Sequence, residues 1–110
     1  MENNQILKEL NACATLCNMC FNGCLNERDV TIFARCIELN RECADFCQLT
    51  ASALTRDSEN IDKYLSMCAE LCQLCADECE KHTNNHCKKC AEVCLTCAEI
   101  CLSVEMASKI

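Results

Sequence analysis

Apolar and thiol side chains recur along this chain at intervals of three and four residues, with polar residues filling the positions between them. Side chains at these intervals share one face of a helix. Four such stripes can be traced, over residues 6–24, 33–54, 61–82 and 87–104. The chain has no proline and a single glycine, so it lacks the residues that punctuate sheets and tight turns. The pattern predicts four helices.

Short polar stretches at residues 26–29, 56–58 and 83–85 separate the stripes. Their Asn, Asp, Ser and Thr residues favour helix N-caps, and we expect Glu59 and Asp62 in the first turn of the third helix. Such short connections make sequential helices antiparallel. The sequence therefore predicts an all-α protein, an antiparallel up-down-up-down four-helix bundle. We expect residues 1–110 to form one domain, with helices of about 20–25 residues, roughly 30–37 Å long.

Cysteine occupies the stripe positions where a bundle normally places leucine, and sixteen of the 110 residues are cysteine. A cysteine-lined core follows, because stripe residues face inward. These cysteines are the candidate metal ligands: Cys13, Cys17, Cys20, Cys24, Cys36, Cys43, Cys47, Cys68, Cys72, Cys75, Cys79, Cys87, Cys90, Cys94, Cys97 and Cys101.

The net charge and the remaining composition restrict the class of protein and the compartment that we expect. The net charge of −7 argues against nucleic-acid binding, and no segment approaches the roughly twenty apolar residues that span a membrane. The N-terminal MENNQILKEL has no export-signal pattern, so we expect a cytoplasmic protein with reduced thiols. Metal binding is favoured over disulfides there. No nucleophile and base pair is evident, so an enzyme is not predicted.

The charge balance of a buried thiolate core favours a monovalent metal. Thiolates select Cu(I), zinc or iron–sulfur clusters. Zinc would form about four tetrahedral sites, each carrying a charge of −2, and the stripes supply almost no compensating groups. Cu(I), on the order of one ion per cysteine, leaves the core nearly neutral. The hypothesis is high-capacity storage and sequestration of Cu(I), serving copper homeostasis and detoxification.

Two alternatives remain at this point. A zinc or cadmium thiolate buffer would show a lower metal-to-protein ratio and colourless tetrahedral sites. An iron–sulfur or redox carrier would be coloured and electroactive. The second is less favoured, because its cysteines come from loops or separate elements, whereas the C-x2-C pairs here lie within helical patterns.

The antiparallel order gives the bundle two different ends. We call one the apolar end; its stripe residues are Ile6, Leu10, Leu54, Ile61, Leu65 and Val104. We call the other the thiol end; it brings together Cys24, Cys36, Cys79, His82, His86 and Cys87. The two histidines are either placed near a helix C-terminus by the helix dipole or receive Cu(I) and pass it to the cysteines. The thiol end is the expected point of copper uptake.

Four further positions carry specific expectations. The start of the fourth helix, beside Lys88 and Lys89, should lower the thiol pKa of Cys87 and Cys90, unless the lysines are ordinary surface charges. Asn40, the one amide in a stripe, either sets helix register, hydrogen-bonds thiolates or ligates copper weakly.

Gly23 marks either the end of the first helix or a close backbone approach at the thiol end.

The stretch CAELCQLCADECEKHTNNHCKKCAEVCLTCAEIC at 68–101, with RECADFC at 41–47, resembles the bacterial copper storage proteins. The resemblance covers essentially the whole chain. It implies a homotetramer of bundles, each holding many Cu(I) ions and taking them up at one end, in the cytosolic branch of the family. A copper chaperone or a low-molecular-weight thiol would then be the donor. Unlike members with a methionine-rich mouth, this chain has only Met19 and Met67 beside cysteines, and we expect both to fill the core.

Overall fold

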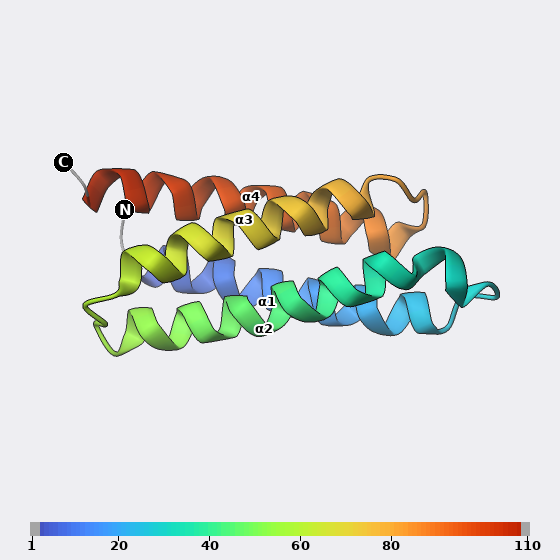
Figure 1. The fold of residues 1–110 in the computed structure, drawn as a ribbon, viewed down its shortest axis with the longest axis horizontal. Coiled ribbons are helices and arrows are strands. Elements are labelled where there is room, and N and C mark those ends of the chain that lie inside the picture. The colour runs from blue at the N-terminus through green and yellow to red at the C-terminus, as the bar shows by residue number, and fades with distance from the viewer. Residues whose placement is uncertain (1–2, 109–110) are drawn as a thin grey trace.

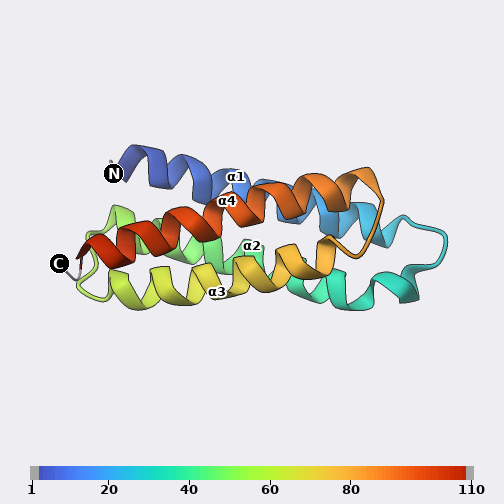
Figure 2. The same cartoon turned by 90° about the horizontal axis from the view of Figure 1, so that it is seen from above.

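The computed structural model describes residues 3–108, and the side chains of residues 3–104. Four antiparallel helices run along the long axis of a body that measures 47 × 20 × 19 Å (Figures 1 and 2). A short 3-10 helix, η1, precedes the second α-helix. The elements in chain order are α1 (Asn3–Leu25), η1 (Val30–Phe33), α2 (Ala34–Thr55), α3 (Ile61–Cys79) and α4 (Asn85–Ser108).

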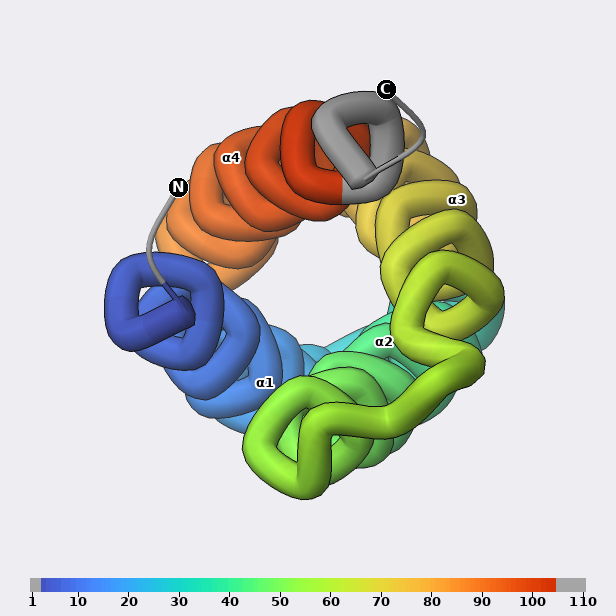
Figure 3. Tube along the Cα trace, turned by 90° about the vertical axis from the view of Figure 1, so that its left-hand side faces the viewer, coloured from blue at the N-terminus to red at the C-terminus, as the bar shows by residue number. Residues whose placement is uncertain are grey.

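Seen down its axis, the bundle is a closed ring in the order α1, α2, α3, α4 (Figure 3). Each helix packs against its two neighbours in the ring, including α4 against α1. The predicted all-α antiparallel four-helix bundle is confirmed. Because the stripes of all four helices face the axis of this ring, side chains from four different helices meet there.

The core consists largely of cysteine, as the stripes predicted. All sixteen cysteines are buried, none with more than 1% of its surface exposed, and all are free thiols. At the apolar end, Ile6, Leu10 and Leu65 are fully buried. The other three residues of that end, Leu54, Ile61 and Val104, are partly buried and pack against the core. The core therefore has a hydrocarbon plug at one end and thiols along the rest of its length.

The helix boundaries differ from the prediction in small ways. Phe33 belongs to η1 rather than to the second α-helix, and Asp62 alone, without Glu59, lies in the first turn of α3. The residues that precede η1 and α3, Asp29 and Asn60, make no side-chain capping hydrogen bond. The helices are therefore held mainly by burial of their stripes and less by their caps.

The end of α2 is closed by a backbone motif that needs a left-handed residue. Asp57 has a φ of 59°, in the region that Asp tolerates better than most non-glycine residues. The N–H of Ser58 donates to the carbonyl of Ala53 (3.0 Å), and the N–H of Asp57 donates to that of Leu54 (3.1 Å). This paired arrangement is the Schellman motif, and it turns the chain sharply into α3.

The expectation that Met19 and Met67 fill the core is wrong. Their side chains are 58% and 46% exposed. Met19 stands one residue before Cys20 and Met67 one residue before Cys68, and each step along a helix turns the side chain by about 100°. Both methionines therefore point away from the axis, and core filling falls to the cysteines.

Among the described helices, none combines the length and the apolar character needed to cross a bilayer.

Candidate metal centre

A layer of four thiols, one from each helix, lies near the middle of the bundle. The sulfur of Cys13 is 3.9 Å from that of Cys43, 3.8 Å from that of Cys72 and 3.7 Å from that of Cys94. The sulfurs of Cys43 and Cys72 are 3.6 Å apart. Four inward stripes thus place sulfur atoms from helices distant in sequence within reach of a single ion.

Neighbouring layers share their sulfurs. Cys13, Cys17 and Cys94 each belong to two of the side-chain groups whose ligand atoms all lie within 4.8 Å of one another. The core is therefore a continuous series of overlapping sites along the axis. Among these groups are Cys13–Cys47–Cys72–Cys97, Cys13–Cys17–Cys43–Cys94, Cys17–Cys75–Cys90–Cys94, Cys20–Cys24–His86–Cys87 and Cys20–Cys79–Cys90.

The sulfur–sulfur distances do not distinguish zinc from Cu(I), but the sharing of sulfurs between layers and the net charge of a loaded core do. A zinc ion with bonds of about 2.3 Å to four sulfurs sets them about 3.8 Å apart, which also fits these layers. Four such sites would, however, bury a charge of about −8. Among the described side chains, the buried polar or charged residues are Asn40, Thr50 and Glu78, so no buried lysine or arginine offsets that charge. Monovalent ions bridged by shared thiolates avoid the problem.

Asn40 crosses the core between the middle layer and the thiol end. Its side chain is fully buried, and its Oδ1 accepts hydrogen bonds from the thiols of Cys75 (3.3 Å), Cys90 (3.5 Å) and Cys79 (3.7 Å). Its Nδ2 donates to the sulfur of Cys36 at 3.7 Å. Of the roles considered from the sequence, hydrogen bonding to the cysteines is the one that these contacts support.

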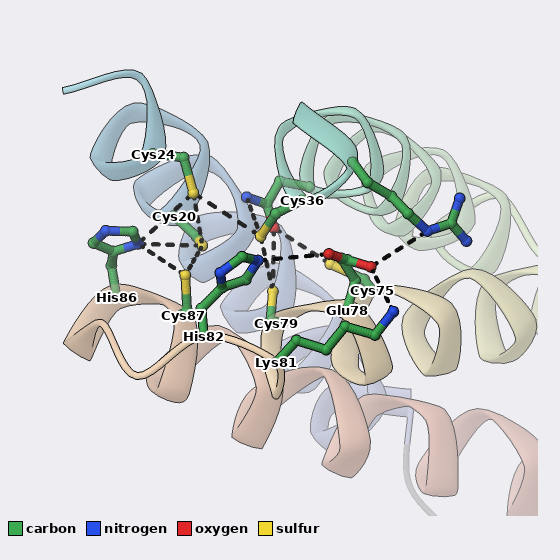
Figure 4. A network of polar contacts seen from close by, with 12 residues as sticks. Cys20, Cys24, Cys36, Cys75, Glu78, Cys79, Lys81, His82, His86 and Cys87 are labelled. Atoms are coloured by element: carbon green, nitrogen blue, oxygen red, sulfur yellow. Dashed lines mark hydrogen bonds and ion pairs between the residues drawn. The ribbon is translucent and has the colours of Figure 1, made fainter. Parts of the chain in front are cut away.

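The thiol end assembles as predicted. The sulfur of Cys36 lies 3.9 Å from that of Cys24 and 3.5 Å from that of Cys79. The sulfurs of Cys20 and Cys87 are 3.8 Å apart. These contacts join α1 to α2, α2 to α3, and α1 to α4, so all four helices contribute to this end of the core (Figure 4).

His86 turns one ring nitrogen into this cluster. Its Nδ1 lies 3.4 Å from the sulfur of Cys87, 3.5 Å from that of Cys20 and 4.0 Å from that of Cys24 (Figure 4). Burial lowers the pKa of His86, but hydrogen bonding to Cys20 and to Glu27 outweighs burial, and the net shift is upward. In its neutral form, the imidazole offers Nδ1 as a ligand beside three sulfurs.

The other ring nitrogen of His86 faces a carboxylate that sequence reasoning missed. His86 Nε2 is 2.7 Å from Oε2 of Glu27, and Asn84 Nδ2 donates to the same oxygen at 2.8 Å. Gly23 lies under the ring, since a Cβ at that position would come within 2.7 Å of His86 Cδ2 and Cγ. The structure thus supports the close approach suggested for Gly23. Glu27 and Asn84 lie in two connections, where stripe periodicity gives no signal.

His82 lies in the connection after α3 and is held differently. Its ring stacks on Phe33, with centroids 4.6 Å apart, and its Nε2 is 3.5 Å from Oε2 of Glu78. Glu78 is only 8% exposed and also forms ion pairs with Arg35 (3.3 Å) and Lys81 (3.2 Å). The sequence did not predict that the Glu78 carboxylate is buried. Glu78 precedes Cys79 and follows Cys75 by three residues, so it lies at the edge of the stripe.

The thiol pKa values depart from the expectation for the start of α4. Burial raises the pKa of Cys87, helped by the charge of Cys20, while Lys88 and Lys89 stay exposed. The pKa of Cys90 is lowered as expected, but by hydrogen bonds with Cys17 and Cys20 rather than by the lysines. The prediction is therefore wrong for Cys87, because its sulfur faces the core.

Cys20, rather than Cys87, is the acidic thiol of this cluster. Hydrogen bonds from Cys36 and Cys79 lower the pKa of Cys20 to about 5, with a further contribution from His86. Burial raises the pKa of Cys24, one turn further along α1, to about 11. The lowered pKa favours the thiolate at Cys20, and the thiolate is the form in which cysteine binds metal.

A four-helix bundle whose axis is a continuous file of shared, buried thiols belongs to the class of multi-ion thiolate metal stores. The sequence model of the copper storage protein family matches residues 1–106. The chain is therefore a member of the copper storage protein family, a family of metal stores and not of enzymes.

Known relatives agree with this membership. The uncharacterized cysteine-rich protein YhjQ of Bacillus subtilis (strain 168) is 44% identical over 80 residues, which are 73% of this chain and 74% of the relative. The structure of Cu(I)-bound copper storage protein BsCsp3 is 39% identical, with a TM-score of 0.90 over 94% of this chain and 97% of that one.

A cytosolic copper storage protein from Streptomyces lividans, with five coppers, is 33% identical, with a TM-score of 0.91 over 94% of this chain and 92% of that one. The Streptomyces lividans protein Ccsp has also been seen loaded with 10 copper equivalents, and that structure matches with a TM-score of 0.91 at 33% identity over 94% and 83%.

Proposed function

We propose that this chain stores Cu(I) at about one ion per thiol, with all sixteen cysteines as ligands. The observation that carries the proposal is the sharing of sulfurs between adjacent layers, as for Cys13 between two four-thiol groups. Ions that each bind two or three bridging thiolates can occupy the whole series of core sulfurs. Isolated tetrahedral sites need four sulfurs each, so two such sites cannot share a sulfur without one of them losing a ligand. Near-neutrality of the loaded core supports the same assignment.

We further propose that copper enters at the thiol end, with His86 as a ligand there and His82 as an early contact. The position of His86 Nδ1 within 4.0 Å of three sulfurs supports its role. The His82 side chain is 13% exposed and lies between Phe33 and Glu78. Its proposed part in uptake rests on its position within the connection between α3 and α4, at the thiol end. Among the described stripe residues of the apolar end, Ile6, Leu10, Leu54, Ile61, Leu65 and Val104, none is a metal ligand, and we propose that this end is closed.

The cellular setting is proposed from the family. The Streptomyces lividans relative is a cytosolic copper storage protein, and we propose the cytoplasm for this chain as well. We also propose a homotetramer, with a copper chaperone or a low-molecular-weight thiol as donor. Sedimentation velocity of the copper-free and loaded protein tests the assembly, and a monomer in both states would contradict it.

A competitive titration tests the stoichiometry. Reduced protein is titrated anaerobically with Cu(I) in the presence of a chromophoric Cu(I) chelator, and we expect saturation at more than ten equivalents per chain and near sixteen. Saturation at four equivalents or fewer would exclude a shared-thiolate core. A parallel zinc titration is the control for the competing buffer function; zinc binding should stop at about four ions and be displaced by Cu(I).

Alanine variants test the two histidines. Replacing His82 and His86 together should slow Cu(I) uptake and leave the final capacity nearly unchanged, because the sixteen thiols remain. The separate variants then divide the effect between the two side chains. Uptake at the wild-type rate in the double variant would refute a role for either one.

A further inference from the structure

We propose that Glu27 is the positioning residue for His86: its carboxylate holds the imidazole so that Nδ1 faces the sulfurs of the thiol end. This inference rests on the proposed function, because it concerns how a ligand of the stored ion is presented. Its geometric basis is a chain of contacts from Asn84 through Glu27 to His86 and on to Cys20 and Cys87.

The first step is the direction of the hydrogen bond. A carboxylate has only acceptor atoms, so the 2.7 Å contact between Glu27 Oε2 and His86 Nε2 requires the proton on Nε2. In the neutral ring, Nδ1 then carries the free lone pair, and Nδ1 is the nitrogen that faces the sulfurs. The carboxylate therefore selects the tautomer that can bind metal at the inner side.

The second step is the fixed position of Glu27 itself. Asn84 Nδ2 donates to the same carboxylate oxygen at 2.8 Å, which ties the end of α1 to the connection before α4. The Glu27 side chain is 29% exposed and that of His86 is 23% exposed, so the pair is largely shielded from water. Shielding and two converging donors keep the carboxylate oriented better than a free surface side chain.

The third step is the surface on which the ring rests. The Cα of Gly23 lies so close to the imidazole that a Cβ would come within 2.7 Å of Cδ2 and Cγ. The ring therefore lies against the backbone of α1, with Glu27 one turn further along the chain. Gly23 limits movement of the ring on one side, and Glu27 fixes its rotation. Together they leave Nδ1 directed into the cluster.

The experiment compares three single variants in the full-length protein. Glu27→Ala removes the acceptor. Glu27→Gln keeps an oxygen at the same reach without the charge. Asp29→Asn is the matched control, because Asp29 is exposed at the same end and accepts its hydrogen bond from the Thr31 hydroxyl, not from His86. The affinity for the first Cu(I) equivalent is measured by chelator competition, and ¹⁵N spectra of the copper-free protein report the His86 tautomer.

We expect Glu27→Ala to weaken the first equivalent by about tenfold, the lower range for loss of an outer carboxylate partner. Glu27→Gln should stay within about threefold of wild type, because its amide oxygen can accept the same bond. Asp29→Asn should match wild type. The ¹⁵N spectra should show the Nε2–H tautomer in wild type and Glu27→Gln, and a mixture of tautomers in Glu27→Ala.

A cycle with His86→Ala separates positioning from simple attraction of cations. In that background Glu27→Ala should have no further effect on affinity. A persistent effect there, equal losses for Ala and Gln, or an equal loss for Asp29→Asn would overturn the proposal in favour of general electrostatics. An unchanged tautomer in Glu27→Ala would overturn it too. Failure of the storage function itself would appear separately, as a low total capacity in the wild type.

Discussion

Alkaline pH should destabilise the copper-free protein through its buried thiols, and Cys24 allows this effect to be isolated. Burial, together with the nearby charge of Cys20, raises the pKa of Cys24 from an ordinary 9.0 to about 11. A raised pKa means that the folded state favours the neutral thiol. The stabilisation is therefore complete below pH 9 and is lost as the pH rises towards and through 11.

The magnitude follows from the same two pKa values. Between pH 8 and pH 11, a shift from 9.0 to about 11 removes about 2 kcal/mol of unfolding free energy for this one thiol. Cys24→Ala lacks the titrating group but keeps a small side chain in the core. Wild type should thus lose about 2 kcal/mol more than this variant over the interval.

Denaturant unfolding followed by circular dichroism, at pH 8 and pH 11 under anaerobic reducing conditions, measures the difference. Copper-loaded wild type is the second control, since metal-bound thiolates have no proton to lose and the pH dependence should be weaker. Identical pH dependences for copper-free wild type and Cys24→Ala would refute the reasoning. They would mean that burial does not raise the pKa of the Cys24 thiol.

Substitutions at three further positions give distinct outcomes. Gly23→Ala should slow Cu(I) uptake and should gain less in thermal unfolding than the roughly 1 kcal/mol of helix propensity, because the new Cβ displaces the His86 ring; stopped-flow uptake and thermal unfolding measure the two effects, and unchanged uptake would argue against the ring's position. Asn40→Leu should leave the free energy of unfolding of the copper-free protein within about 1 kcal/mol of wild type, because the neighbouring thiols can hydrogen-bond one another. Asn40→Ala should cost about 2 kcal/mol, because it leaves a cavity in the core. Equal losses for the two variants in denaturant unfolding would contradict this. Leu65→Ala at the apolar end should cost about 2–5 kcal/mol of copper-free stability without changing capacity in the Cu(I) titration, and a reduced capacity would show that this end also holds metal.

The fold and the inward thiols could be predicted because one rule determines both. A side chain three or four residues from a stripe member must share its face, and four such faces can only be buried against one another. Every cysteine therefore points to the axis in the structure, including Cys36, which is separated from Cys43 by a skipped stripe position. The same rule places Met19 outside, and its expected burial ignored that rule.

The surroundings of the thiol end could not be predicted in the same way. Glu27 and Asn84 reach His86 from two connections whose relative position depends on the packing of α1 against α4. Periodicity describes residues within one helix and carries no information on such contacts between connections. The burial of Glu78 likewise depends on a contact between helices, its ion pair with Arg35 of α2. Asn84 was one of the residues whose type suggested a helix cap, and in the structure its side chain instead donates a hydrogen bond to Glu27.

The most direct test is anomalous diffraction at the copper edge from crystals of the fully loaded, reduced protein. We predict a file of more than ten copper peaks per chain along the bundle axis, each between sulfurs of two or more cysteines, with one peak beside Nδ1 of His86. Four or fewer isolated peaks, copper confined to the outer surface, or sulfurs joined to one another with no ion between them would contradict storage in a shared-thiolate core.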